Sequence, residues 1–277
     1  MIKKIISCGD IHIPSLRGIP ELEETLSKFC NDCQTIVDKD GRDAVRIVVA
    51  GDIFHNKISV TNESIISAGK FFKRLGEICP TIVLAGNHDM LMNNRDRVDS
   101  ISPLFEIGGY PGVTFIDKEL GYKSGCLADD NVVWCLYSSF DGFATPQIDA
   151  EKVSKPDSVY VGLIHGDVNG AVTPTGFSTE NGLDPAVFKG CAFVIAGHIH
   201  KQQEIRKNGV SVVYCSSIRQ RDFGESITGH GYVVWNISKK KPSYEFHDIP
   251  NEDGGFFKFS INGIDSIKDD EEELINL

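Results

Sequence analysis

The sequence predicts an α/β protein built as a two-sheet βαβαβ sandwich flanked by helices. Three observations support this prediction. Residues 1–90 alternate short, continuously apolar runs with amphipathic segments, which is typical of a parallel βαβ unit. Beyond residue 130, strand-like runs follow one another with few helices between them, which indicates a second sheet. Motifs rich in histidine and aspartate follow the ends of several runs, where open α/β sheets place their sites.

The first sheet begins with the run Lys3–Ser7. A helix follows, with Pro20 at its start and glutamates in its first turn, where the helix dipole favours carboxylates. A strand, a helix and a strand come next, at Val45–Ala50, Thr61–Ile78 and Thr81–Ala85. Apolar runs without alternation predict strands buried on both faces, and therefore a parallel order.

The second half of the chain is dominated by strands. Its runs of β-branched and aromatic residues are Val132–Tyr137, Val159–Ile164, Phe193–Ala196, Val210–Tyr214 and Tyr232–Ile237. We expect them to form a second, partly antiparallel sheet packed on the first. A last strand is expected at Phe256–Ile261. The chain then divides into a main domain at residues 1–250 and a C-terminal strand with an acidic tail at residues 251–277.

The composition is that of an ordinary soluble globular protein. The 277 residues are 41% apolar and 24% charged, and no apolar run is long enough to cross a membrane. The apolar start Met1–Ile6 is too short for a signal peptide, so we expect a cytoplasmic protein. The net charge of −11 argues mildly against a nucleic-acid partner, although bound divalent cations would neutralise several acidic groups.

Eight cysteines are scattered along the chain, and Cys30 and Cys33 form the one close pair. A single C-x-x-C pair suits redox chemistry or half of a zinc site, but no second pair completes such a site. Both residues fall on the apolar face of the first helix. We therefore expect buried, reduced thiols.

Five polar motifs, each directly after a predicted strand, contain six of the eight histidines. They are Asp10-x-His12, Gly51-Asp52-x-x-His55, Gly86-Asn87-His88-Asp89, His165-Gly166 and Gly197-His198-Ile199-His200. The first two are weak signals alone, because glycine and aspartate are common in turns. The third is more specific, since a polar cluster after an apolar strand costs desolvation unless it binds something. His198 and His200 are two positions apart on an extended segment and point to the same side, as metal ligands do.

The mixture of ligand types indicates the metal. Carboxylate, amide and imidazole ligands together favour manganese, iron or zinc over calcium. The ligands are too many for one ion, so we expect two divalent cations about 3.5–4 Å apart, bridged by a carboxylate, as in hydrolytic two-metal sites. Mn²⁺ is the favoured ion, with Fe²⁺ or Zn²⁺ as alternatives.

In their order and spacing, the five motifs resemble those of the calcineurin-like metallophosphoesterase superfamily, and the resemblance spans nearly the whole chain. It implies that Asp10, His12 and His200 hold one metal and that Asn87, His165 and His198 hold the other. It also implies that Asp52 bridges the two metals. His88, paired with Asp89, would be the histidine beside the scissile phosphate that binds no metal.

A narrower resemblance concerns the segment Gly51–Lys57 (G-D-I-F-H-N-K). It is similar to the second motif of double-strand-break repair nucleases, among them bacterial SbcD and the small subunit of the T-even phage recombination endonuclease. In the repair-nuclease family a histidine at the position of His55 helps to handle DNA, whereas SbcD-like and phage members often carry aspartate there. The segments Tyr214–Ser217 and Asp222–Glu225 resemble the Y-x-G-S and F-G-E sequences of the same nucleases, although Cys215-Ser216 replaces the usual Pro-Gly.

The same resemblance implies partners. Repair nucleases continue into a DNA-capping domain and a segment that docks on an SMC-like ATPase. Almost all of that region is missing from this chain, so we expect either a minimal member or a catalytic fragment. Residues 251–277 could then be the stub of a capping domain. Repair nucleases also dimerise through helices near the segment Thr61–Ile78. Its wide apolar face predicts either a homodimer or burial against the sheet.

These features predict a metal-dependent DNA nuclease of recombination or repair. A hydroxide held between the two ions would attack the phosphorus in line, and His88 would stabilise the transition state or protonate the leaving oxygen, with Asp89 fixing its tautomer. Arg219 and Arg221, after the last motif, would contact the nucleic-acid backbone or else be solvated surface residues.

Two other functions stay open on the sequence. A small-molecule or cyclic-nucleotide phosphodiesterase on the same fold has the same motifs, and the acidic balance slightly favours it. A non-catalytic scaffold would keep the fold but lose ligands, whereas every expected ligand is present here together with His88. Protein phosphatases fit less well, because Ile53-Phe54-His55-Asn56 departs from their second motif.

Overall fold

The computed structural model describes residues 1–94, 97–146, 158–207, 209–238, 241–251 and 255–257. Its helices are α1 (Ile19–Asp40), α2 (Asn62–Ile78), α3 (Ser102–Ile107) and α4 (Ile116–Glu119). Three short 3₁₀ helices are η1 (Arg42–Ala44), η2 (Ser139–Asp141) and η3 (Pro185–Phe188). The strands are β1 (Lys4–Cys8), β2 (Val45–Ala50), β3 (Thr81–Leu84), β4 (Val113–Phe115), β5 (Gly125–Asp129), β6 (Val132–Tyr137), β7 (Val159–His165), β8 (Phe193–Gly197), β9 (Gln203–Lys207), β10 (Val210–Tyr214), β11 (Gly231–Asn236) and β12 (Ser243–Asp248).

The strands form two six-stranded mixed sheets. The first has the order β12-β11-β1-β2-β3-β4, in which β1 to β4 are parallel and β11 and β12 are antiparallel to their neighbours. The second has the order β5-β6-β7-β8-β10-β9, with a parallel centre and an antiparallel strand at each edge. Because the central strands of each sheet run parallel, their carboxyl ends meet along one edge of that sheet.

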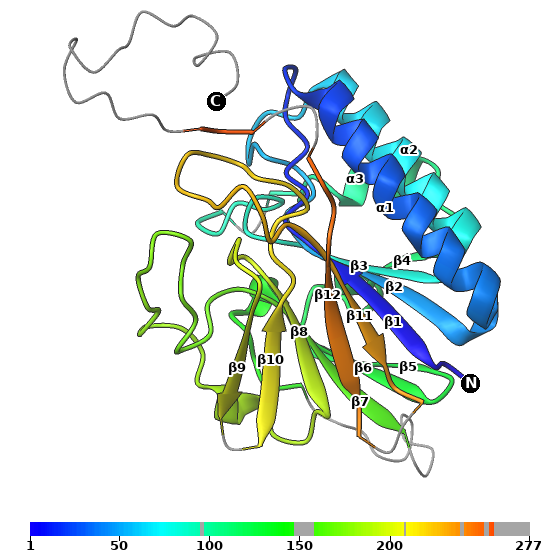
Figure 1. The fold of residues 1–277 in the computed structure, drawn as a ribbon, viewed down its shortest axis with the longest axis vertical. Helices are drawn as coiled ribbons and strands as arrows, with labels where there is room; N and C mark the ends of the chain where they lie inside the picture. The colour runs from blue at the N-terminus through cyan, green and yellow to red at the C-terminus, as the bar shows by residue number, and fades with distance from the viewer. Residues whose placement is uncertain (95–96, 147–157, 208, 239–240, 252–254, 258–277) are drawn as a thin grey trace, which may run out of the picture.

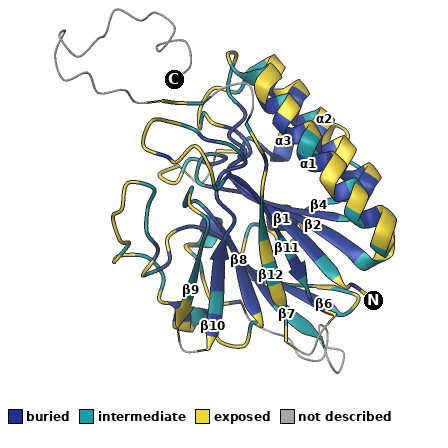
Figure 2. Ribbon diagram, in the orientation of Figure 1, coloured by how far each residue is buried: buried dark blue, intermediate teal, exposed yellow. Residues whose placement is uncertain are grey.

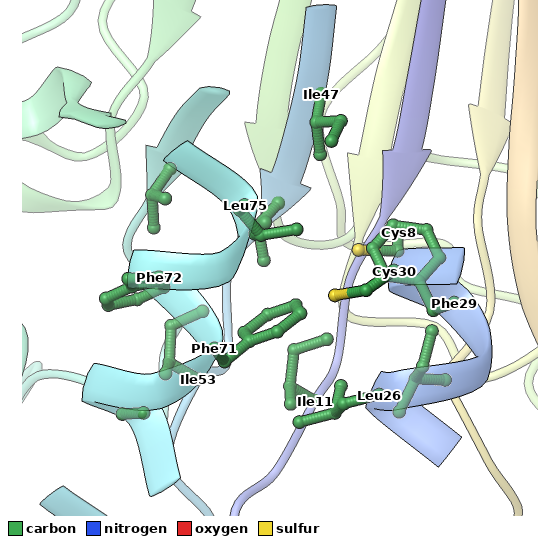
Figure 3. Packing of buried hydrophobic residues seen from close by; sticks show 14 of the residues in the cluster. Cys8, Ile11, Leu26, Phe29, Cys30, Ile47, Ile53, Phe71, Phe72 and Leu75 are labelled. Carbon is green, nitrogen blue, oxygen red and sulfur yellow. The ribbon is translucent and has the colours of Figure 1, made fainter. Parts of the chain in front are cut away.

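Apolar side chains form three buried layers around these sheets. The first layer lies between the first sheet and the helices α1 and α2, where Phe29, Phe71 and Phe72 meet (Figure 3). The second layer joins the two sheets and is filled by Trp134, Trp235 and their neighbours. The third covers the outer face of the second sheet. Figure 2 shows the central strands buried and the outward faces of α1 and α2 exposed.

The two long helices form at the predicted segments. Pro20 lies in the first turn of α1, and Thr61 caps α2 by accepting a hydrogen bond from the Ser64 amide. Cys30 and Cys33 are buried in the first layer, as predicted, and form no disulfide there.

The predicted two-sheet α/β sandwich is confirmed, and one detail of it is corrected. The strand expected at Tyr232–Ile237 does not join the second sheet, because β11 pairs antiparallel with β1 in the first. The long helices cover only the first sheet (Figure 1). The outer face of the second sheet packs instead against loop residues such as Val168 and Ala171 and against η3.

Two other expectations are left open by the described residues. The strand expected at Phe256–Ile261 lies largely outside them, and residues 255–257 are not in a strand. On α2, Phe71, Phe72, Leu75 and Ile78 are buried whereas Ile65 and Ile66 are exposed, so the homodimer stays a prediction. In the part of the chain that the structure describes, no helix has the length and apolar character needed to cross a membrane.

Candidate metal centre

The ten predicted site residues converge at the carboxyl ends of five strands. Asp10 and His12 follow β1, Asp52 and His55 follow β2, Asn87, His88 and Asp89 follow β3, His165 ends β7, and His198 and His200 follow β8. The two sheets meet here directly, because the His165 Nδ1 donates to the Ala50 carbonyl at 2.7 Å. Residues from both halves of the chain therefore share one site, where open α/β sheets place their ligands.

The first group consists of Asp10, His12 and His200, whose ligand atoms lie within 4.8 Å of one another. The Nε2 atoms of His12 and His200 are 3.1 Å apart, and the His200 Nε2 is 3.3 Å from the Asp10 Oδ1. The His200 ring donates its Nδ1 hydrogen to the Glu225 Oε1 at 2.6 Å. The Nε2 of a neutral His200 therefore presents a lone pair to the group.

The second group consists of Asn87, His165 and His198. The Asn87 Oδ1 lies 3.2 Å from the His165 Nε2 and 2.8 Å from the His198 Nδ1. Because the His165 Nδ1 hydrogen is donated to a backbone carbonyl, the Nε2 of the neutral ring faces the group with its lone pair. The far nitrogen of His198, Nε2, lies 3.6 Å from the Asp167 Oδ2.

Asp52 lies between the two groups. Its Oδ2 is 3.4 Å from the His12 Nε2 and 3.3 Å from the His165 Nε2. Its Oδ1 accepts a hydrogen bond from the His88 amide at 2.7 Å. One carboxylate oxygen thus faces both groups, which is the position of a bridging ligand.

Several site residues have a strained backbone conformation. Asp10, His12, Asp52 and His198 all have positive φ angles, a conformation that non-glycine residues adopt at a cost and mostly at functional sites. The motif glycines allow the close approach of neighbouring segments. A Cβ on Gly86 would lie 2.1 Å from the Asp52 Oδ1, and one on Gly197 would lie 2.1 Å from the Ala50 carbonyl oxygen.

His88 and His55 form a pair of rings above the first group. Their centroids are 5.8 Å apart and the rings are stacked. The His88 Nδ1 lies 2.5 Å from the His55 carbonyl oxygen, and the His55 Nδ1 lies 3.1 Å from the Arg221 Nη2. The ring nitrogens of His12, His55 and His88 also come within 4.8 Å of one another.

The expected pairing of Asp89 with the His88 ring is corrected by these contacts. The buried Asp89 carboxylate accepts hydrogen bonds from the amides of Gly86, Ile53 and Phe54. It therefore ties the third motif to the second, and the His55 carbonyl takes the place expected of Asp89 in fixing the His88 tautomer.

The electrostatics indicate that the site is built for cations. Burial opposes a charge on His165, but the Asp52 carboxylate raises the pKa of His165 to about 9. Burial likewise opposes a charge on His200, whereas hydrogen bonds to Asp10 and Glu225 raise its pKa to about 10. Burial would raise the pKa values of Asp10 and Asp52, yet their histidine neighbours lower both. In this chain, protons on histidines offset the buried carboxylates.

Two divalent cations fit this arrangement in place of the protons. In neutral rings, the Nε2 lone pairs of His12 and His200 would face each other across 3.1 Å. A cation shared by these two Nε2 atoms would remove that repulsion and compensate Asp10 and Asp52. The donor set of carboxylate, amide oxygen and imidazole suits such ions.

Sequence reasoning gave no role to two carboxylates that orient the ligands. Glu225 is buried and holds the His200 ring, and Asp167 lies behind His198. Glu225 belongs to the segment Asp222–Glu225, and the resemblance of this segment to the F-G-E sequence of repair nucleases could have identified it. Two hollows of about 330 and 320 Å³ open beside His198, and Asp167 and His198 line both of them.

Comparisons with known proteins agree with this geometry. A family model described as calcineurin-like phosphoesterase matches residues 3–202, a range that includes all five motifs and ends before Glu225. An uncharacterized protein of Acanthamoeba polyphaga mimivirus is 33% identical over 261 residues, which are 91% of this chain and 18% of that protein. A protein of Invertebrate iridescent virus 3, named as a candidate phosphoesterase, is 25% identical over 226 residues, which are 82% of this chain and 61% of that protein.

The chain therefore spans less than two thirds of the length of both relatives. Among solved structures, that of GAP50, the anchor in the inner membrane complex of Plasmodium, is 11% identical with a TM-score of 0.54. This likeness covers 91% of this chain and 86% of that one, and at this identity it concerns the fold alone.

Proposed function

The chain belongs to the calcineurin-like phosphoesterase family, and from this premise we propose that it is a metal-dependent nuclease that hydrolyses phosphodiester bonds of DNA in recombination or repair. Phosphoesterase chemistry and divalent metals follow from the family and its fold. DNA as the substrate, and Mn²⁺ as the favoured metal, are the proposal.

Seven side chains would hold the metals. Asp10, His12 and His200 would bind one ion, Asn87, His165 and His198 the other, and Asp52 both. When bound, such a pair of ions lowers the pKa of a water molecule and screens the phosphate charge. Glu225 and the Ala50 carbonyl keep the Nε2 lone pairs of His200 and His165 directed inward.

His88 supplies the proton chemistry. Its Nδ1 hydrogen is directed at the His55 carbonyl, so the Nε2 remains for the substrate. A protonated Nε2 stabilises charge on the phosphate oxygens or donates its proton to the leaving oxygen. His55 packs along the His88 ring and is itself held by Arg221.

One observation carries the choice of a DNA strand over a small ester. The Arg221 guanidinium, which donates a hydrogen bond to the exposed His55 ring, extends the cationic side of the site beyond His88. A substrate with one phosphate would leave this guanidinium without an anionic partner, whereas a nucleic-acid strand continues past the scissile bond. The resemblance of Gly51–Lys57 to the second motif of repair nucleases points the same way.

A small-molecule or cyclic-nucleotide phosphodiesterase is the second candidate. The net charge of −11 favours it, because an acidic surface repels a long polyanion. A non-catalytic scaffold is the third, and the presence of all seven ligands together with His88 weighs against it.

The test is digestion of a linear DNA duplex with Mn²⁺, run beside bis-p-nitrophenyl phosphate and 2′,3′-cyclic AMP. The control is His88→Ala, which keeps the metal ligands. Degradation of DNA by the wild type and not by the variant supports the proposal. Cleavage of the small diesters while DNA stays intact would replace it with the second candidate, and no hydrolysis of any substrate would favour the scaffold.

Two partner proposals extend the nuclease proposal. An SMC-like ATPase subunit is proposed on the resemblance, and a homodimer through α2 on the exposed Ile65 and Ile66. Sedimentation of the wild type beside an Ile65→Ser, Ile66→Ser variant tests the homodimer. A monomeric mass for the wild type at micromolar concentration would contradict it.

A further inference from the structure

The loop between β10 and β11 carries two arginines that neither bind metal nor transfer a proton in the catalytic scheme. Arg219 and Arg221 are both half-buried. The Arg221 Nη2 donates to the His55 Nδ1 at 3.1 Å, and the Arg219 Nη2 donates to the Gly18 carbonyl at 3.1 Å. Both residues lie beyond the range of the family match.

Within the described part of the chain, these guanidinium groups have no ion-paired carboxylate. Among the described residues, neither forms an ion pair, and the Arg219 Nε is buried without a hydrogen-bond partner. Two nearby carboxylates have other partners, since Glu225 binds the His200 ring and the Arg221 amide, and Asp222 accepts from the Gly224 amide. A third, that of Glu21, acts on Arg219 through its charge without forming an ion pair. Burial, and then the charge of Arg219, lower the pKa of Arg221 to about 10. An anion placed between the two arginines would relieve both effects.

The position of the pair relates it to the reaction centre. Arg221 contacts the His55 ring, and that ring stacks on His88. Arg219 contacts the residue that precedes the 22-residue helix α1, whose N-terminus has a positive dipole. The two arginines therefore extend from beside His55 to the start of α1, where the charge of the Glu21 carboxylate acts on Arg219.

Exposed aromatic rings accompany the arginines. Phe223 is 63% exposed and Phe256 is 41% exposed, with ring centroids 5.1 Å apart. Gln220 holds Phe256 beside the loop through two hydrogen bonds to its backbone. Basic side chains beside exposed rings are typical of surfaces that bind unpaired nucleotides, because the phosphate meets the cation and the base stacks on the ring.

We propose that this loop binds the nucleotide next to the scissile phosphate, with its phosphate on Arg221 and Arg219 and its base on Phe223. The proposal rests on the proposed function and narrows its substrate to strands with at least one further phosphate and an unpaired base. A purely structural role, in which Arg221 only holds His55 in place, is the competing explanation.

The first experiment measures binding without turnover. A fluorescein-labelled oligothymidylate is titrated in EDTA, and again with Mn²⁺ in the His88→Ala background, at several salt concentrations. Each phosphate contact contributes about 0.7 to the slope of log K against log salt for single strands. Arg221→Ala should weaken binding and lower the slope by about 0.7, whereas Arg221→Lys should keep most of it. Arg206→Ala is the matched control, because Arg206 is exposed and paired with Glu204. An unchanged slope in folded Arg221→Ala protein would overturn the proposal.

The second experiment separates substrate binding from support of His55. The ratio of kcat/KM for a thymidine trinucleotide to that for bis-p-nitrophenyl phosphate should fall about 10-fold or more in Arg221→Ala, the size of a lost charge-assisted hydrogen bond. Equal losses on both substrates would establish the structural role instead.

The base is tested with Phe223→Ala. This variant should bind the oligothymidylate several-fold more weakly and bind inorganic tripolyphosphate as the wild type does, because stacking requires a base. Equal binding of both ligands by variant and wild type would remove Phe223 from the proposal. Failure of the proposed function leaves the two binding experiments intact, since binding in EDTA needs no hydrolysis.

Discussion

The two halves of the metal centre are built alike but held differently. In the second group, the His165 ring is fixed by a backbone carbonyl, that of Ala50 at the end of β2. In the first group, the His200 ring is fixed by a side chain, the Glu225 carboxylate of the β10–β11 loop. The first arrangement follows from the packing of two sheets, so no single side chain can be removed to undo it. The second depends on one substitutable residue, and the first group should therefore be the adjustable half.

The largest effect is expected where the two halves meet. Asp52→Asn keeps the shape of the side chain and removes the charge that faces both groups. We expect kcat/KM to fall by at least about 10²-fold, the loss typical of removing one electrostatic stabiliser. Metal content measured by mass spectrometry should fall at both groups. Full loading with near-normal turnover would mean that Asp52 does not bridge them.

The backbone-held half can be broken through Gly197. A Cβ at this position would lie 2.1 Å from the Ala50 oxygen and 2.8 Å from the His165 Nδ1. Gly197→Ala should therefore destabilise the protein by about 1–3 kcal/mol and lower activity, as measured by urea unfolding and hydrolysis of bis-p-nitrophenyl phosphate. The control is Gly108→Ala, whose Cβ would meet no atom within 4 Å. Equal stability of the two variants would contradict the tight junction of the sheets.

The side-chain-held half is tested by Glu225→Gln. Loss of a carboxylate behind a metal-binding histidine typically costs 10–100-fold in metal affinity. In isothermal titration, the Glu225→Gln variant should therefore bind Mn²⁺ in two separated phases. The affinity of the weaker phase should be below that of the wild type, and the affinity of the other should be unchanged. Glu245→Gln, at an exposed position, is the control. A uniform shift of both phases would mean that the two halves are coupled and not independently adjustable.

The smallest effect concerns pH. The pKa of His165 is raised to about 9 and that of His200 to about 10, above the value of about 6.5 for an unfolded histidine. The stability from these protonated rings is thus fully present below pH 6.5 and is lost as pH rises through about 9 and 10. The Tm of the EDTA-treated protein should fall from pH 6.5 to 9, while the gap to the Mn²⁺-loaded protein should widen, because metal binds the unprotonated rings. A constant gap would contradict this linkage.

The strand predictions follow a physical pattern. Every strand with neighbours on both sides is predicted, because strands such as β2 and β6 are buried on both faces and appear as continuous apolar runs. The strands that escaped prediction, β4, β5, β9 and β12, are the sheet edges. The strand Ser243–Asp248, for example, alternates exposed and half-buried residues, so its pairing partner and not its composition makes it a strand.

The candidate ligands were accessible from sequence for a related reason. Buried polar residues directly after apolar strands are costly without a ligand, so Asp10, Asp52 and the other motif residues are recognisable one strand at a time. Three features required the folded chain: the partner of the His88 ring, the role of Glu225 behind His200, and the contact of Arg221 with His55. Each joins segments 25 to 166 residues apart, and no local pattern encodes such a contact. Local burial and ligand chemistry can thus be predicted from the sequence. The orientation of each ligand cannot, because it depends on which distant segment packs behind it.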